Sequence, residues 1–446
     1  MTQHLFPRSF KTHYLEMDHG EGIYLYDKDG KEYLDGCCGA LISNLGHRNR
    51  EIINAVTAQY EKIEFAHPSR WHCDIVEEAA DAVADFAPEG LDQVWFVSGG
   101  SEAIETALKL SRQYFVERDG VTTSKHLTIG RWNSYHGSTI GTMAVAGSMA
   151  RRRFFTPLFR ESPKIPSTYC YRCHYHKSYP ECGMLCAEAL EEKIQVIGPQ
   201  YITSFIAEPI VGSTVGAVVP PDGYWPRVRE ICDKYDILLI ADEVMTGCGR
   251  TGKNFCVDHW NVVPDIIATA KGLAAGYVPT GGIIAKSGIV NTIKDGTGSF
   301  IHGHTYNGNP MSAAAVVAVF KYMKEHHVVE NAAKMGGLLG AGLKKIAAES
   351  RILDDTRGKG LMWGFDVVRD KASKEPFEKK AGSAVVLTKC CLEEGLVIYP
   401  GNGQINGVCG DNFLIAPPLI INEAQIAELL TKFEAGVKKA ETALLS

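Results

Sequence analysis

A lysine and an aspartate each stand where a short apolar stretch of the chain ends. Lys271 follows the apolar stretch 266–269 and lies between two small residues, so its ammonium group has little room to reach water. Desolvation lowers the pKa of a lysine and suits the amine to Schiff-base chemistry. Asp242 directly follows the apolar stretch 237–241, where a carboxylate is costly unless it has a partner such as a protonated ring nitrogen. The plainer alternatives are that Lys271 is an ordinary surface lysine and that Asp242 is the N-cap of the next helix.

A turn rich in small residues follows a third apolar stretch. Gly100 and Ser101 lie in the segment 98–103, which comes after residues 94–97 and opens a helical pattern. Glycines let backbone N–H groups approach an anion, and the N-terminus of a helix carries partial positive charge. This segment could bind a phosphate group, or it could be a tight strand-to-helix turn with Ser101 as its N-cap.

Two further apolar stretches are followed by aromatic or polar side chains. Tyr135 and His136 come after residues 127–129, and Glu208 directly follows residues 202–207. An aromatic ring at the edge of a sheet could stack on a flat heterocycle, although such a ring is more often part of a core. In open α/β sheets, ligands bind beyond the carboxyl ends of the strands, so these side chains are expected near the lysine and the aspartate.

Together these residues match the needs of one cofactor, pyridoxal 5'-phosphate. It requires a phosphate-binding turn, an aromatic ring to stack on, a carboxylate for its pyridinium nitrogen and a desolvated lysine. Asp242 would keep the ring nitrogen protonated, so that the ring can accept the electron pair released at the amino-bearing carbon of the substrate. Lys271 would hold the cofactor as an aldimine and, once displaced by substrate, move the proton between that carbon and the cofactor. The combination is much more specific than any of its members.

The elements that must position these residues form an alternating pattern. Strands are expected at residues 94–97, 127–129, 202–207, 237–241, 266–269 and 281–285. Between them lie helical stretches such as 101–116, in which apolar residues recur at helical spacing. This alternation predicts an α/β fold with a mostly parallel sheet covered by helices on both faces.

From about residue 311 the pattern changes. Helices are expected at 311–324, 383–394 and 423–444, with short strands near 361–367 and 396–399. These elements predict a smaller α+β domain. We therefore expect a large cofactor-binding domain at 61–310, a C-terminal small domain at 311–446, and an N-terminal segment, 1–60, that packs with the small domain.

Composition and charge limit the class of protein. Of the 446 residues, 45% are hydrophobic and 22% charged, as in a soluble globular protein. The 46 basic and 52 acidic side chains give a net charge of −6, which is too acidic for nucleic-acid binding through bulk charge. No apolar stretch reaches the roughly 20 residues that span a membrane, and the N-terminus lacks the apolar core of a signal peptide. We expect a cytoplasmic protein whose 13 cysteines are reduced.

These motifs resemble those of the class III, fold type I pyridoxal-phosphate-dependent aminotransferases, and the resemblance covers nearly the whole chain. The matching segments are 33–35, 46–47, 100–103, 135–137, 242–244, Lys271, 304–305 and 416–419. By this resemblance Val244 packs on the face of the cofactor ring opposite Tyr135, and Glu208 lies near the ring. Thr305 matches the residue that reaches the cofactor phosphate of a partner subunit. The resemblance also implies a homodimer with shared active sites, which could assemble further into a tetramer.

Three charged positions of the family are filled by uncharged residues. Members that act on α-amino acids with 2-oxoglutarate commonly carry an Arg at the position of Leu414, a Glu at that of Ser213 and, in some, a second Arg at that of Ser138. These losses agree, because a buried Glu at position 213 without the Arg at 414 would be an unpaired charge. The clamp for a dicarboxylate acceptor is therefore expected to be absent. Residues 135–139 resemble the ω-aminotransferases, many of which use pyruvate.

Other residues could shape the substrate pocket. Arg70 or the run Arg151–Arg153 could supply a substitute cation, although a solvated basic loop is the simpler interpretation of the run. Leu41 falls near the position at which several ω-aminotransferases carry a pocket Trp, so the donor pocket should differ in shape. Leu414 would suit the methyl group of pyruvate.

A cysteine-rich segment raises the separate possibility of a metal site. Cys170, Cys173, Cys182 and Cys186, with two histidines between them, have a spacing compatible with tetrahedral zinc. A cysteine-rich flap without metal is the favoured interpretation, because the catalytic chemistry already has its cofactor.

The favoured function is that of a pyridoxal-phosphate-dependent aminotransferase with a ping-pong mechanism. It would move an amino group from an ω-amino acid, amine or aminosulfonate to a small 2-oxo acid, with pyruvate favoured. Alternatives on the same cofactor are an amino-acid racemase, a dialkylglycine decarboxylase and an aminomutase. A noncatalytic zinc-binding protein on this scaffold is a more distant alternative, because it predicts loss of the lysine, the aspartate and the phosphate-binding turn.

Overall fold

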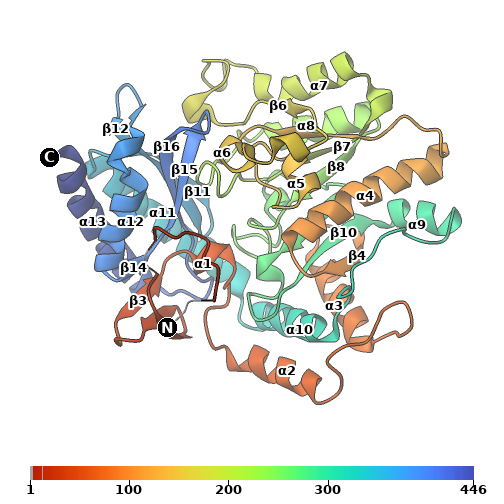
Figure 1. The fold of residues 1–446 in the computed structure, drawn as a ribbon, viewed down its shortest axis with the longest axis horizontal. Helices are drawn as coiled ribbons and strands as arrows, with labels where there is room; N and C mark the ends of the chain where they lie inside the picture. The colour runs from red at the N-terminus through yellow and green to blue at the C-terminus, as the bar shows by residue number, and fades with distance from the viewer. Residues whose placement is uncertain (1–3, 13) are drawn as a thin grey trace.

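The computed structural model of the chain describes residues 4–12 and 14–446. A seven-stranded sheet forms its larger part (Figure 1), with the strands in the order β4 (Leu91–Val97), β10 (Gly281–Lys286), β9 (Ile266–Ala270), β8 (Leu238–Asp242), β7 (Ile202–Ala207), β5 (Leu127–Arg131) and β6 (Lys164–Ile165). β10 is antiparallel to both of its neighbours, and all pairs from β9 to β6 are parallel. The predicted α/β fold with a mostly parallel sheet is confirmed.

Helices cover both faces of this sheet. They include α3 (Asp74–Phe86), α4 (Gly100–Asp119), α7 (Leu185–Ile197), α8 (Tyr224–Lys234) and α9 (Ser287–Asp295). Successive side chains of a strand point to opposite faces, so alternate residues of β7 and β8 enter different cores. Ile206 and Ile240 pack in one hydrophobic cluster with α4 and α9, whereas Phe205 and Leu239 pack in another with α7 and α8. Burial on both faces explains why these strands are continuous apolar runs.

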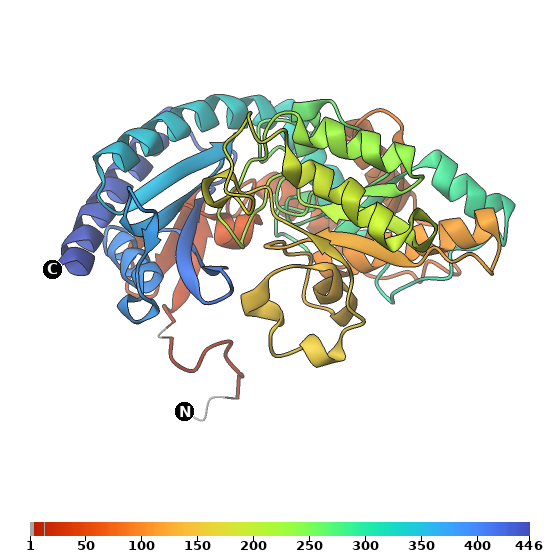
Figure 2. The same cartoon turned by 90° about the horizontal axis from the view of Figure 1, so that it is seen from above.

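A second sheet lies in the C-terminal part of the chain, at the blue end of the molecule in Figure 2. Its strands are β11 (Leu353–Lys359), β12 (Met362–Asp370), β16 (Cys409–Ile415) and β15 (Tyr399–Ile405) in this order, with β13 (Glu375–Pro376) paired to β12. All of these pairs are antiparallel. The helices that pack here are α11 (Val328–Glu349), α12 (Ser383–Glu393) and α13 (Glu423–Leu445).

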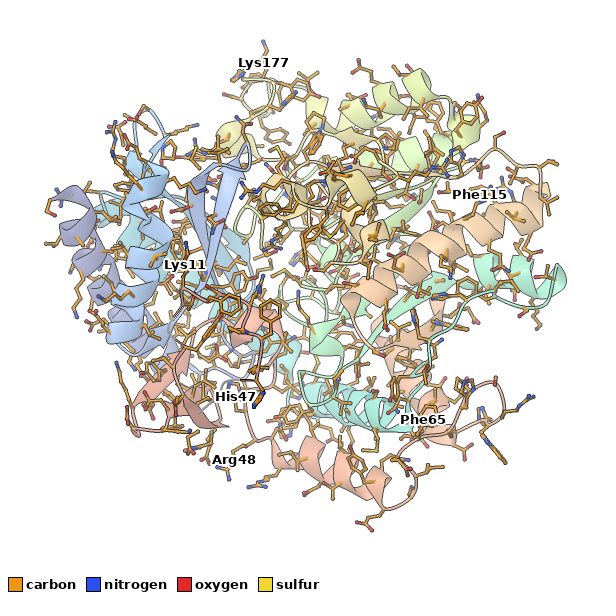
Figure 3. All side chains as sticks on the ribbon, in the orientation of Figure 1. Lys11, His47, Arg48, Phe65, Phe115 and Lys177 are labelled. Atoms are coloured by element: carbon orange, nitrogen blue, oxygen red, sulfur yellow. The ribbon has the colours of Figure 1, made fainter. Side chains whose placement is uncertain are left out.

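The N-terminal strands join this C-terminal part. A third sheet contains β1 (Met17–Glu21), β2 (Tyr24–Asp27), β3 (Glu32–Asp35) and β14 (Leu396–Val397), with β3 parallel to β14. His47, labelled in Figure 3, attaches the loop after α1 (Cys38–Leu41) to this sheet. Its Nε2 lies 3.0 Å from Oδ2 of Asp35 in β3, and its backbone N–H and C=O groups both form hydrogen bonds with the backbone of Gly22. β14 belongs to the segment expected to form the small domain, so this pairing joins the N-terminal strands to that segment.

The remaining elements connect these sheets. They are α1 (Cys38–Leu41), α2 (Arg50–Tyr60), α5 (Ile140–Val145), α6 (Met149–Arg152), α10 (Pro310–Glu325) and short 3-10 helices at Thr156–Leu158, Cys170–Arg172, Pro199–Tyr201, Cys256–Trp260, Lys271–Leu273 and Lys379–Ala381. Although α10 follows the expected boundary at residue 310, it packs against α2 and α3. The domain boundaries therefore stay a prediction. In the described part of the chain, no helix has the length and apolar character needed to cross a bilayer.

Candidate active site

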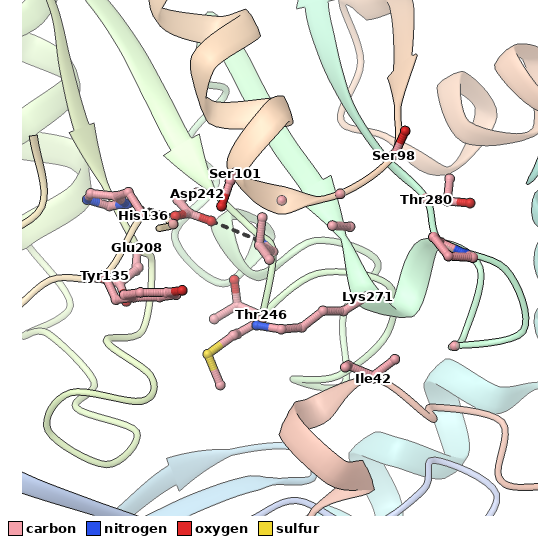
Figure 4. A pocket seen from close by; sticks show the side chains of 18 of the residues that line it. Ile42, Ser98, Ser101, Tyr135, His136, Glu208, Asp242, Thr246, Lys271 and Thr280 are labelled. Carbon is pink, nitrogen blue, oxygen red and sulfur yellow. Dashed lines mark hydrogen bonds and ion pairs between the residues drawn. The ribbon is translucent and has the colours of Figure 1, made fainter. Parts of the chain in front are cut away.

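A cavity of about 360 Å³ lies beyond the carboxyl ends of the parallel strands (Figure 4). Its wall includes Ser98, Gly100 and Ser101 after β4, Tyr135, His136 and Gly137 after β5, Glu208 after β7, Asp242 and Val244 at the end of β8, and Lys271 after β9. The side chains that the sequence predicted at separate strand ends therefore share one cavity. Its volume lies in the range of small-molecule and cofactor sites.

Lys271 is the first residue after β9, and its side chain extends into the cavity (Figure 4). Its backbone has a φ of 46°, in the left-handed region that residues with a side chain rarely adopt and that often marks functional sites. Desolvation lowers the pKa of its amine to about 8. The negative charges of Asp242 and Glu208 act in the opposite direction and raise this pKa, but their effect is smaller. An amine with this pKa can act as a nucleophile near neutral pH.

Asp242 is buried and held from two sides. One carboxylate oxygen lies 2.7 Å from Nδ1 of His136, and the other accepts a hydrogen bond of 3.1 Å from the backbone N–H of Val244. His136 is itself buried, and its Nε2 has no hydrogen-bond partner within the described ranges. The contacts fix the direction of a carboxylate in the cavity wall, where it can face a cationic ring nitrogen.

Glu208 contributes a second buried carboxyl group to the same wall. It accepts a long hydrogen bond of 3.4 Å from the backbone N–H of Tyr135. Desolvation raises its pKa to about 7, an effect that His136 opposes and Asp242 reinforces. This carboxyl group can therefore carry a proton near neutral pH.

The turn after β4 leads directly into α4, a helix of 20 residues whose N-cap is Gly99. Oγ of Ser101 accepts a hydrogen bond of 3.0 Å from the backbone N–H of Ser138, which joins this turn to the segment after β5. Gly137 is required at the junction, because its φ is +130° and a Cβ there would lie 2.5 Å from Oγ of Ser101. The backbone N–H groups at the start of α4 can bind a phosphate group.

A second cavity, of about 490 Å³, adjoins the first, because four residues, Tyr135 and Lys271 among them, line both. Ser138 and Ser213, two of the three uncharged residues noted in the sequence, lie in its wall. Arg151 also lines this second cavity. The two cavities together provide room for a cofactor and, next to it, a substrate.

The three residues expected to contact substrate lie outside the walls of both cavities. Leu41 and Leu414 are buried in the same hydrophobic cluster, and neither side chain is part of the two cavity walls as described. Ala40 and Ile42, which flank Leu41, line the second and the first cavity respectively. Arg70 is exposed and outside both walls. Contact of these three residues with substrate stays a prediction that the burial of the two leucines does not favour.

Some wall residues were not anticipated from the sequence. Thr280 lies just before the antiparallel strand β10, at its amino end, so the rule that ligands bind beyond the carboxyl ends of strands does not identify it. Ile42 belongs to the N-terminal segment, and Thr246 lies in the turn after β8. Thr305 is exposed and lines neither cavity of this single chain, so its expected contact with a partner subunit stays a prediction.

The cysteine-rich segment gives no support to a metal site. Cys170, Cys173, Cys182 and Cys186 are all free thiols. In the described ranges, no group of three or more His, Cys, Asp or Glu side chains has an arrangement that could hold a metal ion. The interpretation of this segment as a cysteine-rich flap without metal stays a prediction.

Comparison with known proteins gives a consistent result. The sequence profile of the class-III aminotransferases matches residues 6–437. The chain is 35% identical over 434 residues to putrescine–pyruvate aminotransferase of Pseudomonas aeruginosa, a match that covers 96% of this chain and 91% of that protein. The chain belongs to the class III aminotransferases.

Solved structures of this family have the same fold. A thermostable (S)-enantioselective ω-transaminase from Thermomicrobium roseum superposes with a TM-score of 0.91 at 34% identity, covering 100% of this chain and 97% of that one. An amine transaminase from an uncultivated Pseudomonas species, solved in its pyridoxal-phosphate-bound form, superposes with a TM-score of 0.91 at 31% identity and covers 99% of both chains. The structure therefore has the fold type I architecture of this class III aminotransferase family.

Class III aminotransferases depend on pyridoxal 5'-phosphate, and the residues of this chain fit that cofactor. The cavity wall combines the amine of Lys271, whose pKa is lowered, with the buried carboxylate of Asp242, which His136 orients. It also contains the N-terminus of α4, and Gly137 lets the segment after β5 lie close to this helix end. These are the groups needed by the aldehyde, the ring nitrogen and the phosphate of the cofactor respectively.

Proposed function

We propose that this class III aminotransferase transfers an amino group from an ω-amino acid, an amine or an aminosulfonate to a small 2-oxo acid by a ping-pong mechanism, with pyruvate as the favoured acceptor. The observation that carries the proposal is the placement of Lys271 and Asp242 beyond neighbouring strands, on the wall of one cavity. The similarity to putrescine–pyruvate aminotransferase and to an ω-transaminase supports this choice of substrates.

Lys271 and Asp242 are the catalytic residues in this proposal. When bound, pyridoxal phosphate supplies an electron sink for the bond that breaks at the amino-bearing carbon. Lys271 attaches the cofactor through its neutral amine and, once released by substrate, holds and moves a proton at Nζ. Asp242, which His136 holds in place, stabilises positive charge on the ring nitrogen of the cofactor.

Five other residues of the same chain bind the cofactor in this proposal. Gly100 and Ser101, at the start of α4, hold the phosphate. Tyr135 stacks on one face of the cofactor ring, and Val244 packs on the other. The side chain of Val244 lies close to Gly100, because a Cβ at that glycine would be 3.1 Å from Cγ1 of Val244. Glu208, next to Tyr135, completes the wall beside the ring.

The choice of acceptor follows from the uncharged residues at positions 138, 213 and 414, where the family resemblance leads us to expect charged ones. With Ser138 and Ser213 in the wall of the second cavity and Leu414 buried in a hydrophobic cluster, none of these three positions offers a charged partner to the second carboxylate of 2-oxoglutarate. An unpaired buried charge typically costs several kcal/mol, and each 1.4 kcal/mol or so is about tenfold in affinity. The test is kcat/KM for pyruvate and for 2-oxoglutarate with one shared amino donor. A clear preference for 2-oxoglutarate would contradict the proposal.

We also propose that the enzyme is a homodimer whose active sites are shared between subunits. Thr305 is exposed in the single chain, as expected of a residue that reaches a partner's cofactor phosphate. Light scattering during gel filtration should give twice the mass of the chain. A monomer that transfers amino groups at full rate would contradict this part of the proposal.

A further inference from the structure

Arg151 directs a guanidinium group into the second cavity. It lies in the short helix α6, and the carbon of its guanidinium group is 4.5 Å from the centroid of the Tyr135 ring. Its Nη1 donates a hydrogen bond of 3.0 Å to Oγ of Ser213. Lys271 lines the same cavity, and the positive charge of Arg151 helps to lower the pKa of its amine. The guanidinium group therefore lies within electrostatic reach of the reacting amine.

The charge of Arg151 is not neutralised by the protein. Within the described ranges, no carboxylate forms an ion pair with it, and its side chain is half-buried. The two arginines that follow are placed differently. Arg152 pairs with Glu161 at 2.5 Å, and Arg153 is exposed, with its guanidinium group over the ring of Phe154. Of the three consecutive arginines, Arg151 alone brings an uncompensated charge to the cavity.

Ser213 accounts for this free charge. A Glu at position 213, as in relatives that use 2-oxoglutarate, would pair with Arg151 and cancel it. The hydroxyl group of Ser213 instead accepts a single hydrogen bond and leaves the other N–H donors of the guanidinium group available. The ring of Tyr135 favours one orientation of the guanidinium plane through a cation–π contact. The result is a positioned donor group that lacks an anionic partner.

We propose that Arg151 binds the carboxylate of the 2-oxo acid acceptor, with Ser213 and Tyr135 as the residues that position it. This inference rests on the proposed function and names the group that recognises the acceptor. A planar guanidinium group binds a carboxylate through two parallel hydrogen bonds, a geometry that Lys cannot reproduce. Arg151 thus takes over the task that relatives give to an arginine at the position of Leu414, a residue buried in the core in this chain.

Among the described arginines of this cavity wall, Arg151 alone is both partly shielded from water and without an acidic partner, which suits an acceptor with a single carboxylate. Arg8 also lines the second cavity, but it is exposed, so water weakens its attraction for an anion. Arg152 already has its acidic partner. An acceptor with one carboxylate, such as pyruvate, therefore satisfies Arg151 completely, whereas a second carboxylate would find no equivalent partner.

The test compares acceptors with and without a carboxylate, using an amine donor that has none. Arg151→Gln should lower kcat/KM for pyruvate about 10- to 100-fold, the range for losing charge-assisted hydrogen bonds. The value for propanal, which lacks the carboxylate, should stay near that of the wild type. Arg151→Lys should recover part of the loss for pyruvate. Arg153→Gln is the matched control and should leave both values near those of the wild type.

Four results would overturn the proposal. An unchanged value for pyruvate in Arg151→Gln, or an equal loss for pyruvate and propanal, would show that Arg151 does not recognise the carboxylate, while the activity of the wild type would still support the proposed function. A selective loss for pyruvate in Arg8→Gln but not in Arg151→Gln would assign the carboxylate to Arg8. A wild type that transfers no amino group to either acceptor would overturn the proposed function, and this inference with it.

Discussion

At the scale of single residues, the orientation of Asp242 by His136 makes a direct prediction. Asp242→Asn should retain part of the cofactor but lower turnover on the order of 10²-fold or more, because an amide cannot stabilise positive charge on the ring nitrogen. Turnover and the visible absorbance of bound cofactor are the two measurements. Asp92→Asn, at an exposed position of β4, is the control. Near-normal turnover in Asp242→Asn would show that the carboxylate does not have this role.

The lowered pKa of Lys271 predicts how cofactor attachment depends on pH. Only the neutral amine attacks an aldehyde, so the rate at which cofactor-free protein captures pyridoxal phosphate should rise with pH and level off above about pH 8. Because the pKa is lower in the folded than in the unfolded chain, the contribution of this group to stability also becomes more favourable between about pH 8 and pH 10.5. Stopped-flow absorbance measures the capture rate. A midpoint near pH 10 would mean that the amine is not desolvated.

The sequence identifies the catalytic residues better than the substrate-binding ones. Lys271 and Asp242 stand out because each ends a stretch that is otherwise apolar. Thr280 and Ile42 reach the same cavity from segments with no such signal, since tertiary packing alone places them there. Arg151 is one of three equivalent arginines in the sequence, and its contacts with neighbouring side chains distinguish it.

At the scale of elements, the junction between the turn after β4 and the segment after β5 depends on Gly137. Gly137→Ala should weaken cofactor binding and destabilise the fold by about 1–3 kcal/mol, because the added Cβ would meet Oγ of Ser101 at a backbone φ of +130°. Cofactor titration and thermal unfolding measure the two effects. Gly288→Ala in α9, where a Cβ meets no atom within 4 Å, should be neutral or slightly stabilising. Equal behaviour of the two variants would contradict the steric argument.

Six of the seven strands of the large sheet were predicted, and burial on both faces explains the continuous apolar runs of β7, β8 and β9, whereas the two-residue strand β6 has no such run. The helix α11 was not expected from the sequence, and Gly336 and Gly340 lie in its interior. Tertiary contacts require both glycines: a Cβ at Gly336 would lie 2.1 Å from the carbonyl oxygen of Gly360, and one at Gly340 would lie 2.0 Å from the ring of Trp363. Such close approaches between distant segments leave no local signal.

At the scale of the whole molecule, Asp366 joins the segment after β6 to the small sheet. It is fully buried on β12 and contacts Tyr169 at 2.5 Å, Arg357 at 2.9 Å and Gln404 at 2.6 Å. Asp366→Ala should lower the free energy of unfolding by about 3 kcal/mol, because it leaves buried polar groups with fewer partners. Denaturant unfolding measures this loss, and Asp370→Ala, at the exposed end of the same strand, is the control. Equal stability of the two variants would mean that the network contributes little.

The placement of Lys271 is tested most directly by reducing the holoenzyme with borohydride and mapping the labelled peptide by mass spectrometry. The cofactor should be found on Lys271 alone, and Lys271→Ala should lose both the absorbance of attached cofactor and steady-state amino transfer. Labelling of another lysine, or turnover retained in Lys271→Ala, would contradict the assignment of this cavity as the catalytic centre.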